Sequence, residues 1–147
     1  MNKFGSVSEV LDFAINREIE AHNFYMKLAD FVEKPEMAKV LSDLASEELE
    51  HKEKLEAIKA GEIVIDEEEV GNLGITSHVK DVEQHPKMSY VELLIVGMKK
   101  EETSRKLYTD LATIAQTQEL RDTFLKLAKE EANHKLRFEI EYDLMTF

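Results

Sequence analysis

The sequence predicts an all-α protein, a four-helix bundle built from one helical hairpin used twice. Only five glycines and two prolines interrupt its 147 residues, and apolar residues recur at spacings of three and four, the periodicity of amphipathic helices. The pattern also repeats at an offset of 83 residues, which carries Glu18 onto Glu101 and Tyr25 onto Tyr108. Two similar halves with helical periodicity indicate two similar hairpins.

The first hairpin is expected over about residues 6–60. It opens with a capping box, in which the side chains of Ser6 and Glu9 satisfy free backbone N–H groups. A second helix begins at Pro35, and Gly61 is expected just past its end. The residues expected to face the core are Val7, Leu11, Ala14, Glu18, Ala21, Tyr25, Leu28 and Val32, followed by Met37, Leu41, Leu44, Glu48, His51, Leu55 and Ile58.

The second hairpin is expected over about residues 89–145. Ser89 and Glu92 form another capping box, 83 residues after the first, and a short turn is predicted near Gln116-Thr117. The core-facing residues expected here are Leu93, Leu94, Gly97, Glu101, Ser104, Tyr108 and Leu111, followed by Leu120, Phe124, Leu127, Glu131, His134 and Phe138.

A long crossover, about residues 61–88, connects the two hairpins. Its acidic run at 66–69 is expected to be a solvated face. Two short links and one long connection predict that the second and third helices run parallel, as in ferritin-like folds. At this length the chain is expected to form one domain over residues 1–147.

The composition excludes several classes of site and partner. The chain has no cysteine, which excludes disulfides, thiolate zinc sites, iron–sulfur centres and cysteine nucleophiles, and it fits the cytoplasmic location that we expect. A net charge of −12 would be repelled by nucleic acid and by anionic lipid, so neither is an expected partner. No stretch approaches the roughly 18 apolar residues of a membrane span, and the N-terminus does not read as a signal peptide.

The most specific functional pattern is Glu-x-x-His, which occurs at 48–51 and again at 131–134. A Glu and a His three residues apart project from one helix face. These pairs and two lone glutamates fall on the apolar stripes, where four buried carboxylates would repel one another unless cations balanced them. Two divalent ions would supply the balancing charge. The predicted metal ligands are Glu18, Glu48, His51, Glu101, Glu131 and His134.

The remaining polar residues are assigned smaller roles. Tyr25 and Tyr108, two turns beyond Glu18 and Glu101, either donate hydrogen bonds to the ligands or serve only as core aromatics. Carboxylate and imidazole ligands suit iron or manganese and do not exclude zinc. Residues expected not to bind metal are Glu47, Glu50, Glu102 and Glu130, which lie off the stripes as surface glutamates, and His22, His78 and His85.

These motifs resemble the rubrerythrin branch of the ferritin-like superfamily over nearly the whole chain. The resemblance implies that Glu48 and Glu131 bridge two iron ions, that Glu18 and Glu101 each bind one ion, and that the two histidines complete the shells. The matching stretches are Glu18-x-x-Ala21-x-x-Phe24-Tyr25, Leu44-Ala45-x-Glu47-Glu48-x-x-His51-Lys52, Glu101-x-x-Ser104-x-x-Leu107-Tyr108 and Leu127-Ala128-x-Glu130-Glu131-x-x-His134-Lys135.

The chain departs from the rubrerythrin pattern in two places. Rubrerythrins carry a cysteine-ligated rubredoxin domain that feeds electrons to the di-iron site, and this cysteine-free chain has none. They also carry an extra glutamate one turn after the third helix's ligand, used in a redox-linked ligand switch. Ser104 stands at that position here.

The resemblance implies a di-iron oxidoreductase, a non-haem peroxidase-like enzyme of oxidative-stress defence. It would reduce hydrogen peroxide or dioxygen with electrons from an external donor such as a rubredoxin-like protein, and the expected assembly is a homodimer. Two alternatives stay open. One is a ferroxidase or iron-storage protein, which would need a hollow multi-subunit shell. The other is a redox-silent bundle that binds metal only for stability.

Overall fold

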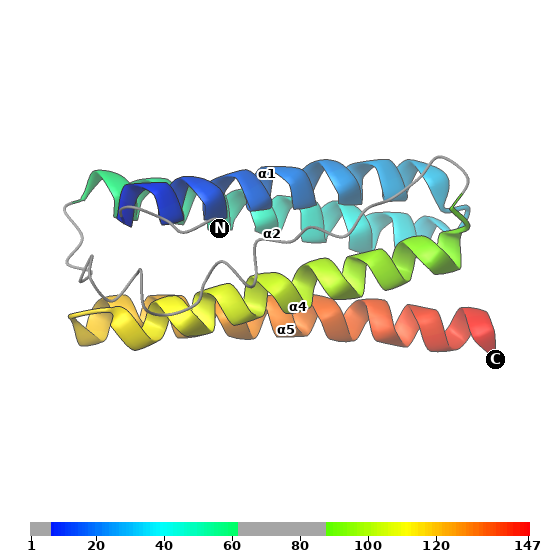
Figure 1. Ribbon diagram of the computed structural model, residues 1–147. Coiled ribbons are helices and arrows are strands. Elements are labelled where there is room, and N and C mark those ends of the chain that lie inside the picture. Colours follow the sequence, from blue (N-terminus) through cyan, green and yellow to red (C-terminus); the bar gives the residue numbers. More distant parts are fainter. Residues whose placement is uncertain (1–6, 62–87) are drawn as a thin grey trace.

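The computed structural model describes residues 7–61 and 88–147, and nearly all of them are helical. The four helices, labelled as in Figure 1, are α1 (Val7–Phe31), α2 (Pro35–Ala60), α4 (Tyr90–Ile114) and α5 (Gln118–Thr146). The all-α bundle predicted from the sequence is therefore confirmed. The connection expected at about 61–88, with His78 and His85, lies outside the described residues except at its two ends.

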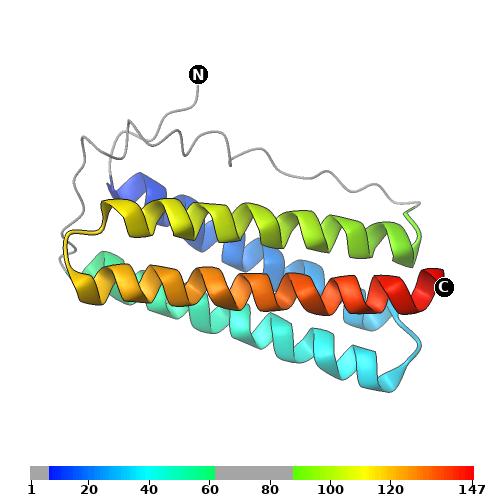
Figure 2. The ribbon, with the colours of Figure 1, turned by 90° about the horizontal axis from the view of Figure 1, so that it is seen from below.

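The helices are arranged as two hairpins. α1 packs along α2 and α4 packs along α5, and the two hairpins meet mainly through α1 and α4. In Figure 1 the chain colours show that α1 and α5 run in one direction and α2 and α4 in the other. Figure 2 shows the same four helices from below, with α4 and α5 side by side. None of the described helices has an apolar stretch that could cross a membrane.

Local sequence explains where the helices begin. Ser89 Oγ accepts a hydrogen bond from the Glu92 backbone N–H at 3.2 Å, and Glu92 Oε1 accepts one from the Ser89 N–H at 3.1 Å, which confirms the second capping box. Thr117 caps α5 by accepting from the Leu120 N–H at 3.1 Å. Pro35 opens α2 as predicted. Ser6, the cap expected for the first helix, lies outside the described residues.

Gly61 closes α2 without using the conformational freedom of glycine. Its φ of −95° is an ordinary right-handed value, and its N–H bonds to the Ile58 carbonyl at 3.2 Å. We expected it one position beyond the cap, where glycine is common. It is instead the cap itself, because the last turn tightens to an i→i−3 bond.

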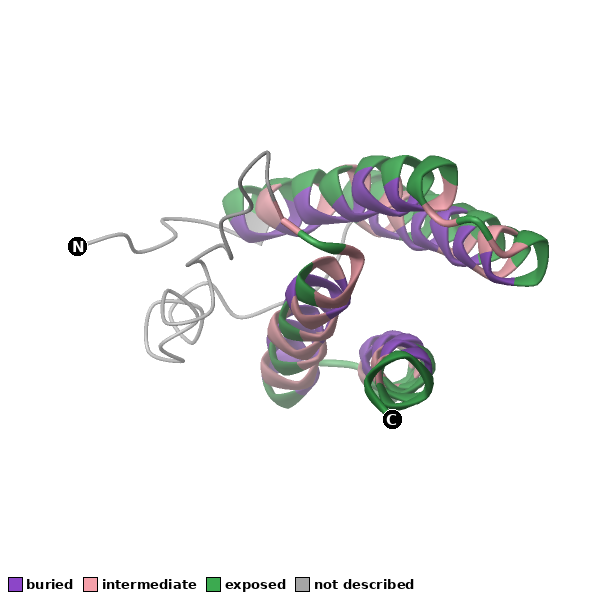
Figure 3. Ribbon diagram, turned by 90° about the vertical axis from the view of Figure 1, so that its right-hand side faces the viewer, coloured by how far each residue is buried: buried purple, intermediate pink, exposed green. Residues whose placement is uncertain are grey.

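The core has two apolar clusters with a band of polar residues between them. The buried faces of the helices point toward one another, as Figure 3 shows. One cluster is centred on Leu11, Leu111 and Phe124 and the other on Leu28, Leu41 and Phe138. Nearly all predicted core positions from Leu11 onward are buried, and the exceptions at the stripe ends (Val32, Ile58, Leu93 and Leu120) are partly exposed. The burial of Val7, also predicted to face the core, is not described.

Gly97 has a packing role in the second cluster. A Cβ at this position would lie 3.1 Å from the nearest ring carbon of Phe138, which is fully buried. The missing side chain therefore lets α4 approach the aromatic ring that α5 supplies.

Candidate metal centre

Each helix contributes to one buried polar cluster. α1 and α4 contribute one glutamate each, and α2 and α5 each contribute a glutamate and a histidine. All six side chains are 2% exposed or less, although each could ionise. The predicted ligands are thus brought together at one place in the bundle. The cluster consists of Glu18, Glu48, His51, Glu101, Glu131 and His134.

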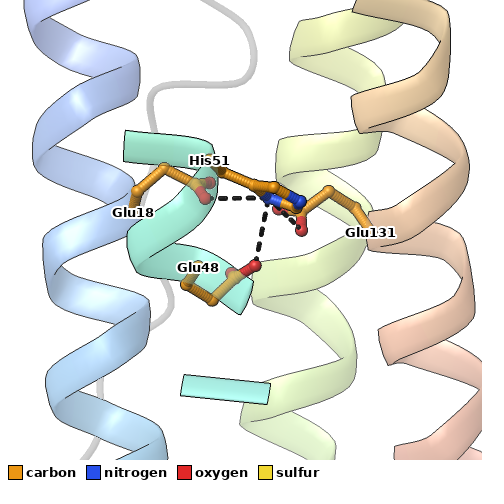
Figure 4. A group of neighbouring side chains, drawn as sticks. All are labelled: Glu18, Glu48, His51 and Glu131. Carbon is orange, nitrogen blue, oxygen red and sulfur yellow. Dashed lines mark hydrogen bonds and ion pairs between the residues drawn. The ribbon is translucent and has the colours of Figure 1, made fainter. Parts of the chain in front are cut away.

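The cluster divides into two groups of four that share two residues. Figure 4 shows the first group, Glu18, Glu48, His51 and Glu131. The second group combines Glu48 and Glu131 with Glu101 and His134. Within each group, one ligand atom from every residue lies within 4.8 Å of the others. Glu48 and Glu131 are therefore the residues positioned between two ion sites, whereas the other four each belong to one.

Both histidines present Nδ1 to the carboxylates. His51 Nδ1 lies 3.0 Å from Glu18 Oε2. It also lies 3.3 Å from Glu48 Oε1 and 3.3 Å from Glu131 Oε1. His134 Nδ1 lies 3.2 Å from Glu48 Oε1 and 3.4 Å from Glu131 Oε1. The two rings stack nearly parallel, with centroids 5.9 Å apart. The pseudo-symmetry of the sequence repeat is thus reproduced in the inner part of the cluster.

The outer nitrogens of the histidines face glutamates of the opposite hairpin. His51 Nε2 forms a hydrogen bond of 2.7 Å with Glu130 Oε2, and His134 Nε2 lies 3.6 Å from Glu47 Oε1. Such carboxylate partners fix the ring orientation and tautomer of metal-binding histidines. Both glutamates were expected at the surface because they lie off the apolar stripes. Their repetition directly before Glu48 and Glu131 was the feature that could have identified them.

The two tyrosines link α1 to α4 through the cluster. The Tyr108 hydroxyl on α4 donates to Glu18 Oε1 on α1 at 3.0 Å. The Tyr25 hydroxyl on α1 donates to Glu101 Oε1 on α4. Each tyrosine therefore contacts the glutamate of the other hairpin rather than the one on its own helix. Ser104 is buried on α4, one turn after Glu101.

Other polar residues near the cluster have structural partners. His22 lies 3.0 Å, through Nδ1, from the Ala45 carbonyl oxygen, which ties α1 to α2. Glu102 forms a bidentate pair with Arg105 on the same helix, and this pairing lowers the pKa of Glu102 to about 2. Neither residue belongs to either ligand group.

In the metal-free chain, the buried charges strongly perturb one another. Burial, reinforced by the charge of Glu48, raises the pKa of Glu18 to about 8, although His51 opposes the shift. Burial also raises the pKa values of Glu101 and Glu131. For Glu48 burial acts in the same direction, but contacts with the two imidazoles outweigh it and lower the pKa to about 2.

The histidines show the complementary shifts. Burial alone would lower their pKa values, but the surrounding carboxylates reverse this effect: they raise the pKa of His51, and they raise that of His134 to about 11. Four glutamates and two imidazoles can thus share protons in the absence of metal, at the cost of keeping several charges away from water.

Many donor atoms of the cluster have no hydrogen-bond partner among the residues that the structure describes. Buried polar atoms are normally satisfied, so unsatisfied ones at a converging site indicate a missing ligand. Oxygen and imidazole nitrogen are the donors that divalent first-row metals accept. The residues present therefore fit a pair of metal ions. The atoms concerned are both carboxylate oxygens of Glu48 and of Glu131, Oε2 of Glu101 and both ring nitrogens of His134.

Comparison with known proteins gives one family. The family described as Rubrerythrin matches residues 9–89 and 92–145, which include all six residues of the cluster. No curated protein and no solved structure matches the chain.

Proposed function

The chain belongs to the rubrerythrin family, and on that premise we propose that it is a di-iron oxidoreductase that reduces hydrogen peroxide or dioxygen. The electrons would come from an external carrier, such as a rubredoxin-like protein. The observation that supports this best is the pair of overlapping ligand groups that share Glu48 and Glu131. Two ions that share carboxylates lie close enough together to act on one small substrate.

The residues have distinct roles in this proposal. Glu48 and Glu131 would be shared between the two ions, Glu18 and Glu101 would each hold one ion, and His51 and His134 would offer Nδ1. Iron is chosen over manganese and zinc because of the family, since the donor atoms suit all three. Bound as a reduced pair, the ions would supply the two electrons that cleavage of an O–O bond requires.

The protein's own contribution is to orient groups and to hold protons. Reduction of one peroxide to two waters consumes two electrons and two protons. Burial, together with the nearby charge of Glu18, raises the pKa of Tyr108 well above its usual value, so this hydroxyl keeps its proton at neutral pH. It then remains a donor to Glu18 and holds that carboxylate in place. Tyr25 holds Glu101 in the same way.

An anaerobic oxidation experiment tests the proposal. The protein is purified without oxygen, its metals are measured, and the reduced form is mixed separately with peroxide and with dioxygen. We expect two irons per chain and the consumption of one peroxide per iron pair. Redox-silent zinc, with no oxidation by either reagent, would favour a structural bundle. Oxidation of added iron inside a large multi-subunit shell would favour storage.

A further inference from the structure

The two halves of the centre, matched in sequence, differ in how their histidines are held. Glu130 fixes His51 by a 2.7 Å hydrogen bond. Neither ring nitrogen of His134 makes a hydrogen bond, and its outer nitrogen lies 3.6 Å from Glu47. The side chain of Glu47 is 44% exposed, compared with 27% for Glu130. Of the two histidines, His134 is therefore the one whose ring is held by fewer hydrogen bonds.

His134 also forms part of the wall of a surface groove. The groove lies between α2 and α5, which contact each other less than α1 and α4 do, and has a volume of about 410 Å³. Asp43 and Glu47 line it on α2, and Asn133 and Leu136 line it beside His134 on α5. A cation with six waters needs roughly 180 Å³ at about 30 Å³ per water, so a hydrated metal ion fits.

The charges along this groove differ from those at the matching positions of the repeat. Asp43 and Glu47 supply two carboxylates, against one cation, Arg137, among the lining residues. Lys39 pairs with Asp43 at 2.9 Å, but both side chains are well exposed, and such a pair leaves most of the local field in place. The residue 83 positions after Asp43 is Lys126. At this one position the repeat has an acid on the His134 side and a lysine on the other, whereas the groove residues Asn133 and Leu136 match the acids Glu50 and Glu53.

We propose that the α2–α5 groove is the route by which divalent metal ions enter the centre, with Glu47 and His134 as the first protein ligands. An oxygen and a nitrogen 3.6 Å apart can bind one ion together, because each bond is about 2.0–2.2 Å long. Rotation of the His134 ring would then pass the ion inward to Glu48, Glu101 and Glu131. The inference rests on the proposed metal centre and adds the path by which the ions reach it.

Loading of the metal-free protein with Co²⁺ tests the route by a readout independent of catalysis. Uptake is followed by stopped-flow visible absorbance, and the final metal content is measured. We expect the double variant Asp43→Asn/Glu47→Gln to load at least tenfold more slowly at low salt. The matched control is Glu50→Gln/Glu53→Gln, which removes two exposed charges from the same helix outside the groove and should load like the parent.

A steric pair of variants provides a second measurement. Leu136→Trp narrows the groove and should slow loading, whereas Leu125→Trp, at an exposed position elsewhere on α5, should not. Parent-like rates for both Asp43→Asn/Glu47→Gln and Leu136→Trp would overturn the route and leave the metal centre intact. A parent protein that binds no Co²⁺ would overturn the centre as well.

Discussion

At the scale of single residues, Glu48 and Glu131 differ from the other ligands because they belong to both ligand groups. Each occupies a helix position where a bundle core normally has an aliphatic side chain. Without metal, neither has a hydrogen bond for its two oxygens. Burying a carboxylate without hydrogen bonds costs free energy, so packing alone does not explain a glutamate at these positions.

Replacing Glu48 should therefore remove metal from both positions. We expect Glu48→Ala to lose most of the iron, measured as metal per chain after equilibration with excess Fe²⁺ and desalting. Glu50→Ala, an exposed glutamate two residues away, should retain the parent content. Equal losses from the two variants would show that the ligand register assigned here is wrong.

Ser104 is the residue that separates this chain from the rubrerythrin pattern with an extra glutamate. With serine there, each ion is offered one unshared glutamate, one histidine and two shared carboxylates. We therefore expect both histidines to remain bound in both redox states. The preference for peroxide over dioxygen should be smaller than in a rubrerythrin that carries the extra glutamate and its ligand switch.

Introducing the missing carboxylate tests this assignment. Ser104→Glu should raise the ratio of the peroxide rate to the dioxygen rate by about tenfold or more, measured by stopped-flow oxidation of the reduced protein. Ser104→Gln has a similar size without the charge and should leave the ratio near that of the parent. A parent that already prefers peroxide by orders of magnitude, together with an unchanged Ser104→Glu ratio, would refute the role of this position.

At the scale of helices, the tyrosine–glutamate bonds join the two hairpins. Because α1 and α4 form the main contact between hairpins, Tyr25 and Tyr108 make their hydrogen bonds at the principal interface of the bundle. Leaving a buried acceptor without its hydrogen-bond donor costs roughly 1–3 kcal/mol. Both bonds should therefore affect stability as well as ligand placement.

Removing either hydroxyl should weaken the metal-free fold. We expect Tyr25→Phe and Tyr108→Phe each to lower the free energy of unfolding by about 1–2 kcal/mol in chelator, measured by urea denaturation. Tyr142→Phe is the control, because the Tyr142 hydroxyl makes no hydrogen bond with the described residues. If all three substitutions cost the same, the cross-hairpin bonds contribute nothing specific.

The helices and their inward faces were predictable because each depends on residues close in sequence. Ser89 and Glu92 fix the start of α4 by themselves, and the apolar spacing fixes which side of each helix is buried. The repeat extended this reasoning to the six clustered residues, since residues in matched positions of two similar hairpins meet near one pseudo-axis.

The contacts between hairpins were not predictable in the same way. A helix's own periodicity places Glu130 off its stripe, but its distance to His51 depends on how closely α2 and α5 approach. The same holds for the tyrosines, whose partners lie across the bundle. Glu47 and Glu130 show this most clearly. They occupy equivalent positions in the sequence repeat, and only the packing of the helices makes their distances to the histidines differ.

At the scale of the whole molecule, the net charge of −12 favours cations near the protein, and the cluster places part of that charge in the core. The metal-free protein must hold protons there. Glu18, with a pKa near 8 when folded and 4.5 when unfolded, binds more proton in the folded state between those values. His134, raised from 6.5 to about 11, does so at higher pH.

These shifts determine how stability depends on pH. Where the folded state binds more protons, stability falls as pH rises, so the metal-free protein should become less stable from about pH 5 to pH 8. Glu48 has the opposite sign, since its lowered pKa of about 2 contributes stability above pH 4.5 that is lost only in stronger acid. Metal binding requires deprotonated ligands, so metal-loaded protein should gain stability over the same range.

We therefore expect the difference in melting temperature between metal-loaded and chelated protein to widen as pH rises from 5 to 8. Metal at a thousandfold excess over its dissociation constant stabilises the folded state by roughly 4 kcal/mol. At lower pH, protons compete for the same ligand atoms and raise the apparent dissociation constant, so this stabilisation becomes smaller. Thermal melts at several pH values, with and without chelator, measure the difference directly. A glutamine variant at Glu18 should flatten the slope of the chelated protein, because it removes one of the groups that binds the extra proton. A gap that stays constant with pH would mean that protons and metals do not compete for this cluster.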